Sequence, residues 1–280
     1  MPLIPGLQKS VNGQIVPWTE PAGELSEVLE RQRRELTSAQ LGVIDLQQPG
    51  SVALVSLDYS AATQGEMEPL AEAVISRLRG QGMRLIFVSL EPEGAALAQR
   101  TLDRILAERN ETYGAEVINL GYVPGQVVGI RELVSGRRSL AGMADFKNGL
   151  TFAAPERAGW NTINNLGQID VVITLADNPA TARWWIEQMA AAVPPDDGER
   201  YLLAATSALA DPLVRPYLES GQLNGLLSGL NGAAAIEAGR KNFGAARQML
   251  DSQSMAHLTM VILIAAGTMA GWMPEQKDQA

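Results

Sequence analysis

Cysteine is absent from this chain of 280 residues, and histidine occurs once. The two absences exclude disulfides, cysteine-based zinc sites, thiolate nucleophiles and metal centres built from several histidines. Basic residues are also scarce, since 22 Lys and Arg face 31 Asp and Glu and leave a net charge of −9. Binding to a phosphate backbone needs a basic surface, so the composition argues against nucleic acid as a partner.

Sequence patterns that identify a reaction are missing as well. The chain has no G-x-G-x-x-G dinucleotide pattern, no G-x-x-x-x-G-K-[ST] phosphate loop and no G-x-S-x-G nucleophile elbow. No pattern identifies a cofactor or a metal site. Residues 1–20 contain no basic region followed by an apolar run, so they do not read as a secretory signal, and we expect the main domain in the cytoplasm.

An apolar run of 18 residues without formal charge lies near the C-terminus, from Ala256 to Met273. A helix that spans a bilayer needs roughly 20 mostly apolar residues, with a lower limit near 17. The run therefore fits two interpretations, a membrane anchor or the buried closing helix of a soluble domain. Arg240, Lys241 and Arg247 precede the run, and Lys277 is the only basic residue after it. If the run spans a membrane, this bias would keep the large domain on the cytoplasmic side.

Apolar strand-like segments alternate with helix-like segments through the middle of the chain. This alternation predicts an α/β fold with a doubly wound, mainly parallel, Rossmann-like sheet of five strands. The expected strands are Ser51–Leu57, Arg84–Leu90, Glu116–Leu120, Asp170–Leu175 and Tyr201–Thr206. The expected helices between them include Glu66–Arg79, Ala95–Glu108 and Pro179–Ala192. Because Ser51–Leu57 is among the most apolar strands, we expect it at the centre of the sheet.

Changes in composition divide the chain into three regions. Residues 1–46 read as an irregular leader followed by an amphipathic helix at Gly23–Leu41. Residues 47–210 form the α/β domain, and residues 211–280 form a helical segment rich in Gly and Ala that ends with the apolar run.

Glycines four residues apart recur in the C-terminal region. Gly221, Gly225 and Gly229 form one set, and Gly267 and Gly271 repeat the spacing inside the apolar run. On a helix this spacing makes a groove that lets another helix approach closely, whereas in a loop the first set would only add freedom. The predicted partners are therefore the membrane and other helices through Gly267 and Gly271, including those of a homo-oligomer.

Polar residues follow the expected strands, where open α/β sheets bind their ligands. The predicted ligand-binding candidates are Asp58, Tyr59, Ser89, Asn119, Tyr122, Asp177, Asn178 and Ser207. Each also has a structural interpretation, because Asp or Asn before a helix caps it and Ser at a strand end often satisfies loop backbone. If the site binds a ligand, its two carboxylates should favour a cation, an amine or hydroxyl groups over a phosphate.

Several segments together resemble an uncharacterised family of prokaryotic membrane-associated proteins, in which an α/β, Rossmann-like domain lies next to transmembrane helices. The segments are Ser56-Leu57-Asp58-Tyr59, Gly65-Glu66-Met67, Val88-Ser89-Leu90, Asn119 to Gly125, Arg215-Pro216-Tyr217 and Ser220-Gly221-Gln222. The likeness covers roughly residues 50 to 270. It implies an architecture and a location, and no activity.

The leading functional hypothesis is a noncatalytic, membrane-associated α/β protein with a scaffold or ligand-sensing role. The absence of catalytic motifs motivates it. The alternative is a cytoplasmic enzyme or small-ligand-binding protein that uses the crevice at the carboxyl ends of the strands.

Overall fold

The computed structural model describes residues 8–11, 14–17, 42–45, 47–152, 160, 163, 166–192, 200–238 and 244–271. The amphipathic helix expected at Gly23–Leu41 lies outside these residues, as do the last two residues of the apolar run. Part of the expected irregular leader is regular, because strands β1 (Gln8–Val11) and β2 (Gln14–Pro17) pair antiparallel.

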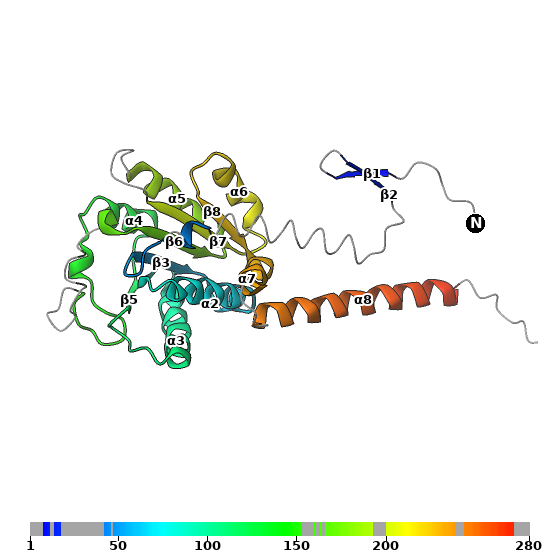
Figure 1. The fold of residues 1–280 in the computed structure, drawn as a ribbon, viewed down its shortest axis with the longest axis horizontal. Coiled ribbons are helices and arrows are strands. Elements are labelled where there is room, and N and C mark those ends of the chain that lie inside the picture. Colours follow the sequence, from blue (N-terminus) through cyan, green and yellow to red (C-terminus); the bar gives the residue numbers. More distant parts are fainter. Residues whose placement is uncertain are drawn as a thin grey trace, which may run out of the picture.

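A six-stranded parallel sheet forms the centre of the α/β fold (Figure 1). Its strands are β3 (Val52–Asp58), β4 (Arg84–Ser89), β5 (Val117–Tyr122), β6 (Val171–Ala176), β7 (Tyr201–Thr206) and β8 (Gly225–Ser228). Their order in the sheet is β5-β4-β3-β6-β7-β8. The strand expected at the centre, β3, pairs with β4 on one side and β6 on the other.

The prediction of five strands is wrong, because β8 adds a sixth beside β7. Leu226 and Leu227 in β8 are buried on opposite faces of the sheet, which is the alternation of a strand rather than of a helix. The first set of glycines therefore does not form one helical groove: Gly225 opens β8, and Gly221 lies in a turn with φ of +77°. The sheet thus extends past residue 210, where we expected the α/β domain to end.

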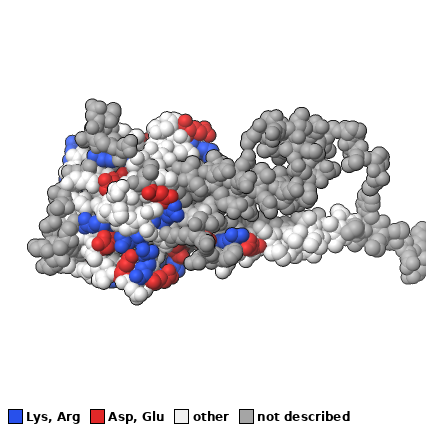
Figure 2. All heavy atoms as spheres, in the orientation of Figure 1, with Lys and Arg blue, Asp and Glu red and all other residues white. Residues whose placement is uncertain are grey.

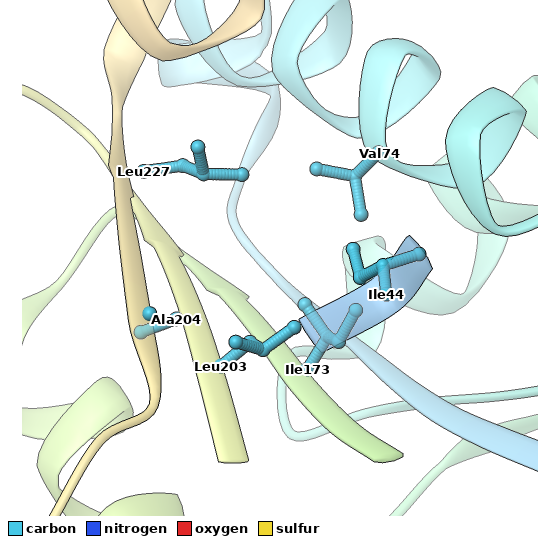
Figure 3. Close-up of a pocket in the computed structure, with 7 residues that line it drawn as sticks. Ile44, Val74, Ile173, Leu203, Ala204 and Leu227 are labelled. Carbon is cyan, nitrogen blue, oxygen red and sulfur yellow. The ribbon is translucent and has the colours of Figure 1, made fainter. Parts of the chain in front are cut away.

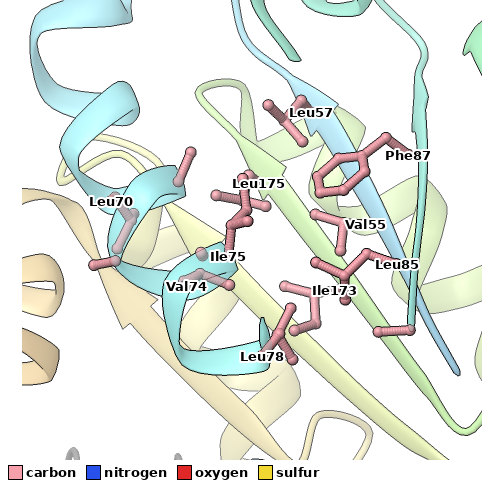
Figure 4. Close-up of a cluster of buried hydrophobic side chains, with 14 of the residues drawn as sticks. Val55, Leu57, Leu70, Val74, Ile75, Leu78, Leu85, Phe87, Ile173 and Leu175 are labelled. Atoms are coloured by element: carbon pink, nitrogen blue, oxygen red, sulfur yellow. The ribbon is translucent and has the colours of Figure 1, made fainter. Parts of the chain in front are cut away.

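Helices cover both faces of the sheet. One face carries α2 (Gln64–Gly80), α3 (Pro92–Arg109) and α7 (Gly229–Ala238), and the other carries α4 (Val127–Val134), α5 (Pro179–Ala192) and α6 (Asp211–Glu219). Figure 4 shows the apolar side of α2 packed on β3, β4 and β6, with Val74 and Leu78 facing Ile173. Neighbouring positions of β3 alternate between the two faces, so both faces of the strand are buried. Burial on both faces explains the near-continuous apolar strands in the sequence.

Part of the segment that links β5 to β6 lies against the β5 edge of the sheet. Besides α4 it contains two short 3-10 turns at its described positions, η2 (Leu140–Gly142) and the start of η3 (Leu166–Gln168). The backbone N–H of Phe146 donates to the carbonyl of Asn119 on β5 at 2.8 Å. An edge strand covered in this way is protected from pairing with another chain.

The C-terminal apolar run lies in α8 (Ala245–Gly271), a single helix that leaves the α/β body beside α7 (Figure 1). Its first turn is anchored, because Ala246 is fully buried in the core cluster under α2 and α7. Every residue from 251 to 268 is exposed. Figure 2 shows that α8 carries charged residues only near the body and is uncharged farther out. From Ala256 to Thr268 the apolar run is therefore not buried against any described part of this chain.

Candidate functional site

The point where the chain reverses its direction of winding lies between β3 and β6. Strands β3, β4 and β5 succeed one another to one side, and β6, β7 and β8 to the other. Open α/β sheets bind ligands at the carboxyl ends of the two strands at this switch point. Asp58 ends β3 there, and the N–H of Asp177 after β6 donates to the carbonyl of Asp58 at 3.3 Å. The structure thus brings these predicted residues together.

The carboxylate of Asp58 has a structural role. It is fully buried and accepts three hydrogen bonds from three different elements. The N–H of Leu90 donates to Oδ1 at 2.6 Å, the hydroxyl of Ser56 to Oδ2 at 2.5 Å, and the indole N–H of Trp185 to Oδ2 at 2.8 Å. The carboxylate therefore joins β3, the end of β4 and α5, and has no oxygen turned toward solvent.

Burial controls the protonation of this group. Desolvation raises the pKa of Asp58 from 3.8 to about 6, against the three hydrogen bonds, which favour the charged form. The nearby carboxylate of Glu91 adds a smaller rise in the same direction. Asp58 thus changes charge close to neutral pH, inside the fold.

Asp177 accepts hydrogen bonds from the start of the first crossover. Its Oδ2 accepts from the N–H of Ser60 at 3.2 Å, the hydroxyl of Ser60 at 3.5 Å and the hydroxyl of Thr63 at 2.6 Å. These donors lie at the start of the crossover that leads from β3 through η1 (Ala61–Thr63) into α2. Helix starts after the first strand are the usual phosphate site of such folds. Here the protein's own carboxylate takes those donors.

Two glutamates after β4 add to the negative charge at the switch point. Glu93 accepts from the N–H of Ala61 at 3.2 Å. Desolvation and then repulsion from Asp177 and Glu93 raise the pKa of the partly exposed Glu91. Negative charge therefore gathers at this edge of the sheet, and the preference of the site for a cation over a phosphate stays a prediction.

Ser89 fastens β4 to its neighbours. It is fully buried, and its hydroxyl contacts the carbonyls of Leu57 and Glu91 at 2.6 and 2.8 Å and accepts from the N–H of Glu91 at 3.0 Å. Gly94 leaves room for this arrangement, because a Cβ there would lie 2.2 Å from the Ser89 hydroxyl. These contacts are those of a structural serine.

Asn119 and Tyr122 lie on β5, two strands away from the switch point. Asn119 is buried, donates to the carbonyl of Ala95 at 3.0 Å and accepts from the N–H of Gly121 at 2.9 Å. The side chain of Tyr122 is 41% exposed. Tyr59 turns into the core on the α2 side, where burial raises the pKa of its phenol. These three residues therefore do not join Asp58 and Asp177 in one cluster.

Asn178 and Ser207 each accept a backbone N–H just ahead of a helix. Asn178 accepts from the N–H of Ala180 at 2.9 Å and so caps α5, whose first residue is Pro179. Ser207 accepts from the N–H of Ala210 at 3.2 Å before α6 and donates to the carbonyl of Asp177 at 3.0 Å. The structural interpretation accounts for both.

Two further residues complete this edge of the sheet and were not among the predicted candidates. Trp185 is one of two adjacent tryptophans in the sequence, and its indole N–H donates to Asp58. Glu66 accepts from the N–H of Ala208 at 2.7 Å and sits against Gly229, where a Cβ would lie 2.2 Å from its Oε1. Neither pairing leaves a signal in the sequence, because the partners are far apart along the chain.

A hollow in the fold lies away from these residues, between the sheet and α2 (Figure 3). It is lined by apolar side chains such as Ile44, Val74 and Leu227, and it has room for about one water molecule at most. Among the described residues, no group of three or more His, Asp or Glu is placed to hold a metal ion.

No known protein family matches the chain, and no curated protein matches it significantly.

Proposed function

We propose that this chain is a noncatalytic, membrane-anchored α/β protein with a scaffold or ligand-sensing role, and that α8 is its anchor. The observation that carries the proposal is that α8 is apolar on all sides within the run that begins at Ala256, and that every residue from 251 to 268 is exposed. Of the described residues, α8 is the one helix long and apolar enough to cross a membrane by length and composition. The resemblance to a family of prokaryotic membrane-associated proteins supports the same location.

The apolar side chains of α8 point in every direction around the helix. Met260, Val261, Ile262, Leu263 and Ile264 are consecutive and between 57% and 66% exposed. Successive residues of a helix turn by about 100°, so five in a row leave no polar side. Each such side chain gains roughly 1.5–3 kcal/mol on full transfer out of water. A helix that is apolar all round is stable in lipid or in a protein core, and the core of this chain does not cover it.

The hydroxyl groups of α8 are compatible with lipid. Each donates to a backbone carbonyl four residues earlier, at 2.8 to 2.9 Å, and the donors are Ser252, Ser254, Thr259 and Thr268. A polar group in hydrocarbon must find its partner within the protein, because no water is present there. These bonds supply such partners within the helix itself.

The length of α8 suits a single span. The apolar run from Ala256 to Met273 carries no formal charge, and its 18 residues exceed the roughly 17 that a single helical span requires. Asp251 and Arg247 come just before this stretch. The basic residues ahead of the run favour a cytoplasmic position for the α/β domain.

The noncatalytic part of the proposal rests on how the predicted site residues are used. Asp58, Ser89 and Asn119 bind other parts of the fold, and Asp177 covers the donors of the first crossover. The alternative, an enzyme or small-ligand-binding protein that uses this crevice, needs polar groups that are free to meet a ligand. The hydrogen bonds of these residues therefore favour the anchored, noncatalytic protein.

The experiment is flotation of the purified full chain with lipid vesicles in a density gradient. The unaltered protein should float, and Ile262→Arg should not, because an arginine near the centre of a span costs about 3 kcal/mol, roughly a hundredfold in partition. Gln248→Arg, which adds the same charge in the exposed polar part of α8, is the matched control and should float. A full chain that is monodisperse without detergent and stays at the bottom of the gradient would overturn the proposal.

A further inference from the structure

The junction between α7 and α8, here called the joint, is held in one geometry by specific contacts. Both carboxylate oxygens of Glu237, near the end of α7, accept from the first turn of α8: Oε1 from the N–H of Ala246 at 3.2 Å and Oε2 from the N–H of Arg247 at 3.1 Å. The first N–H groups of a helix have no partner within it, and a carboxylate there also meets the positive end of the helix dipole. Glu237 thus caps α8 from a different helix.

Two neighbouring residues make this cap specific to one geometry. Gly244 lies against the Glu237 carboxylate so closely that a Cβ at this position would be 2.1 Å from it. Ala246 is fully buried in the core cluster that also contains Ala233 and Ile236 of α7. The start of α8 is therefore held by a double hydrogen bond on one side and by core packing on the other.

Beyond the joint, α8 begins with a polar stretch. Residues 247–254 include Arg247, Gln248, Asp251, Ser252, Gln253 and Ser254, and the apolar run begins only at Ala256. The eleven residues from Ala245 to Met255 belong to the same uninterrupted helix as the run and extend over about 16 Å.

We propose that the capped joint and this polar stretch make α8 a rigid mast, which holds the α/β domain at a fixed height and orientation above the membrane. The inference rests on the proposed function for the membrane, but the rigidity of the joint is a property of the chain alone. A hinged linker would let the domain turn freely, whereas the mast presents one face of the domain to a partner at a set distance from the bilayer.

The joint is tested with two spin labels on the full chain in detergent micelles and in vesicles. Because the chain has no cysteine, labels at Glu108→Cys on α3 and Gln253→Cys on α8 are unique, and both positions are exposed. We expect a single narrow distance distribution in this otherwise unaltered protein. Adding Glu237→Ala, or Gly244→Ala, should broaden it, and adding Glu219→Ala, which removes an exposed carboxylate at the end of α6, should not.

Circular dichroism and tryptophan fluorescence of each variant check that the α/β domain remains folded. A broad distribution in the unaltered protein, or a distribution that stays narrow in both joint variants, would overturn the mast. Flotation separates this outcome from failure of the anchor. A protein that floats but shows a broad distance distribution would support the membrane anchor and contradict the rigid mast. A protein that does not float but shows a narrow distance distribution would support the rigid joint and contradict the membrane anchor.

Discussion

The buried carboxylate of Asp58 should make the stability of the fold fall as the pH rises toward neutrality. Its pKa is raised from 3.8 to about 6 in the folded protein, so the folded state binds this proton more tightly than the unfolded state does. The stabilising contribution is therefore fully present below pH 3.8 and is lost as the pH rises through about 6. A rise of this size corresponds to about 3 kcal/mol.

The variant Asp58→Asn isolates this contribution. The amide cannot titrate, and its NH2 group must face one of the three donors that now meet the carboxylate, which costs about 1–3 kcal/mol. At pH 4 the variant should be clearly less stable than the unaltered protein. At pH 7 the difference in stability should disappear or change sign, because the unaltered protein then carries an ionised, desolvated carboxylate.

The assay is urea unfolding of the full chain in micelles at several pH values between 4 and 8. Tryptophan fluorescence is a suitable signal, because Trp185 donates directly to Asp58. The difference in unfolding free energy between the two proteins should change by about 2.4 kcal/mol across this range. Carboxylates that do not interact with Asp58 contribute equally in both proteins and cancel in the difference. A difference that is independent of pH would refute the reasoning.

The remaining predictions concern packing, buried hydroxyls and the crevice. Gly94→Ala should destabilise the fold by about 1–3 kcal/mol in urea unfolding, because its Cβ would lie 2.2 Å from a backbone oxygen of β3; Gly65→Ala, with nothing within 4 Å, should not. Thr206→Val should stabilise by about 1 kcal/mol, since the Thr206 hydroxyl is buried without a hydrogen-bond partner among the described residues. Ser207→Ala should instead destabilise by about 1 kcal/mol, because it removes a turn cap, and equal effects of the two changes would contradict this view. Calorimetric titration with nucleotides should give no binding heat, and tight binding without a metal would show that the carboxylates do not close the crevice.

Strand positions were predictable where burial on both faces produced long apolar runs. All five expected strands lie within one or two residues of β3 to β7. The sixth strand, β8, was missed because four residues with a glycine at the start carry too little pattern. Its pairing with β7 supplies what the local sequence does not.

Contacts between distant residues set the limit of prediction in the candidate site and in α8. Topology placed Asp58 and Asp177 correctly at neighbouring strand ends, but the partner of Asp58 in α5 is 127 residues away in sequence. The start of α8 was likewise not predictable from its polar first turns. It depends on Glu237, a cap that comes from another helix.

Insertion of α8 into lipid is tested most directly by labelling single cysteines with a membrane-impermeant maleimide. The natural chain contains no cysteine, so Ser252→Cys and Ile262→Cys each report one position of α8 in reconstituted vesicles. Both side chains are exposed in the protein alone, so the fold itself shields neither. The anchor predicts rapid labelling at 252 and none at 262 until detergent dissolves the vesicles. Equal labelling at the two positions before detergent is added would contradict it.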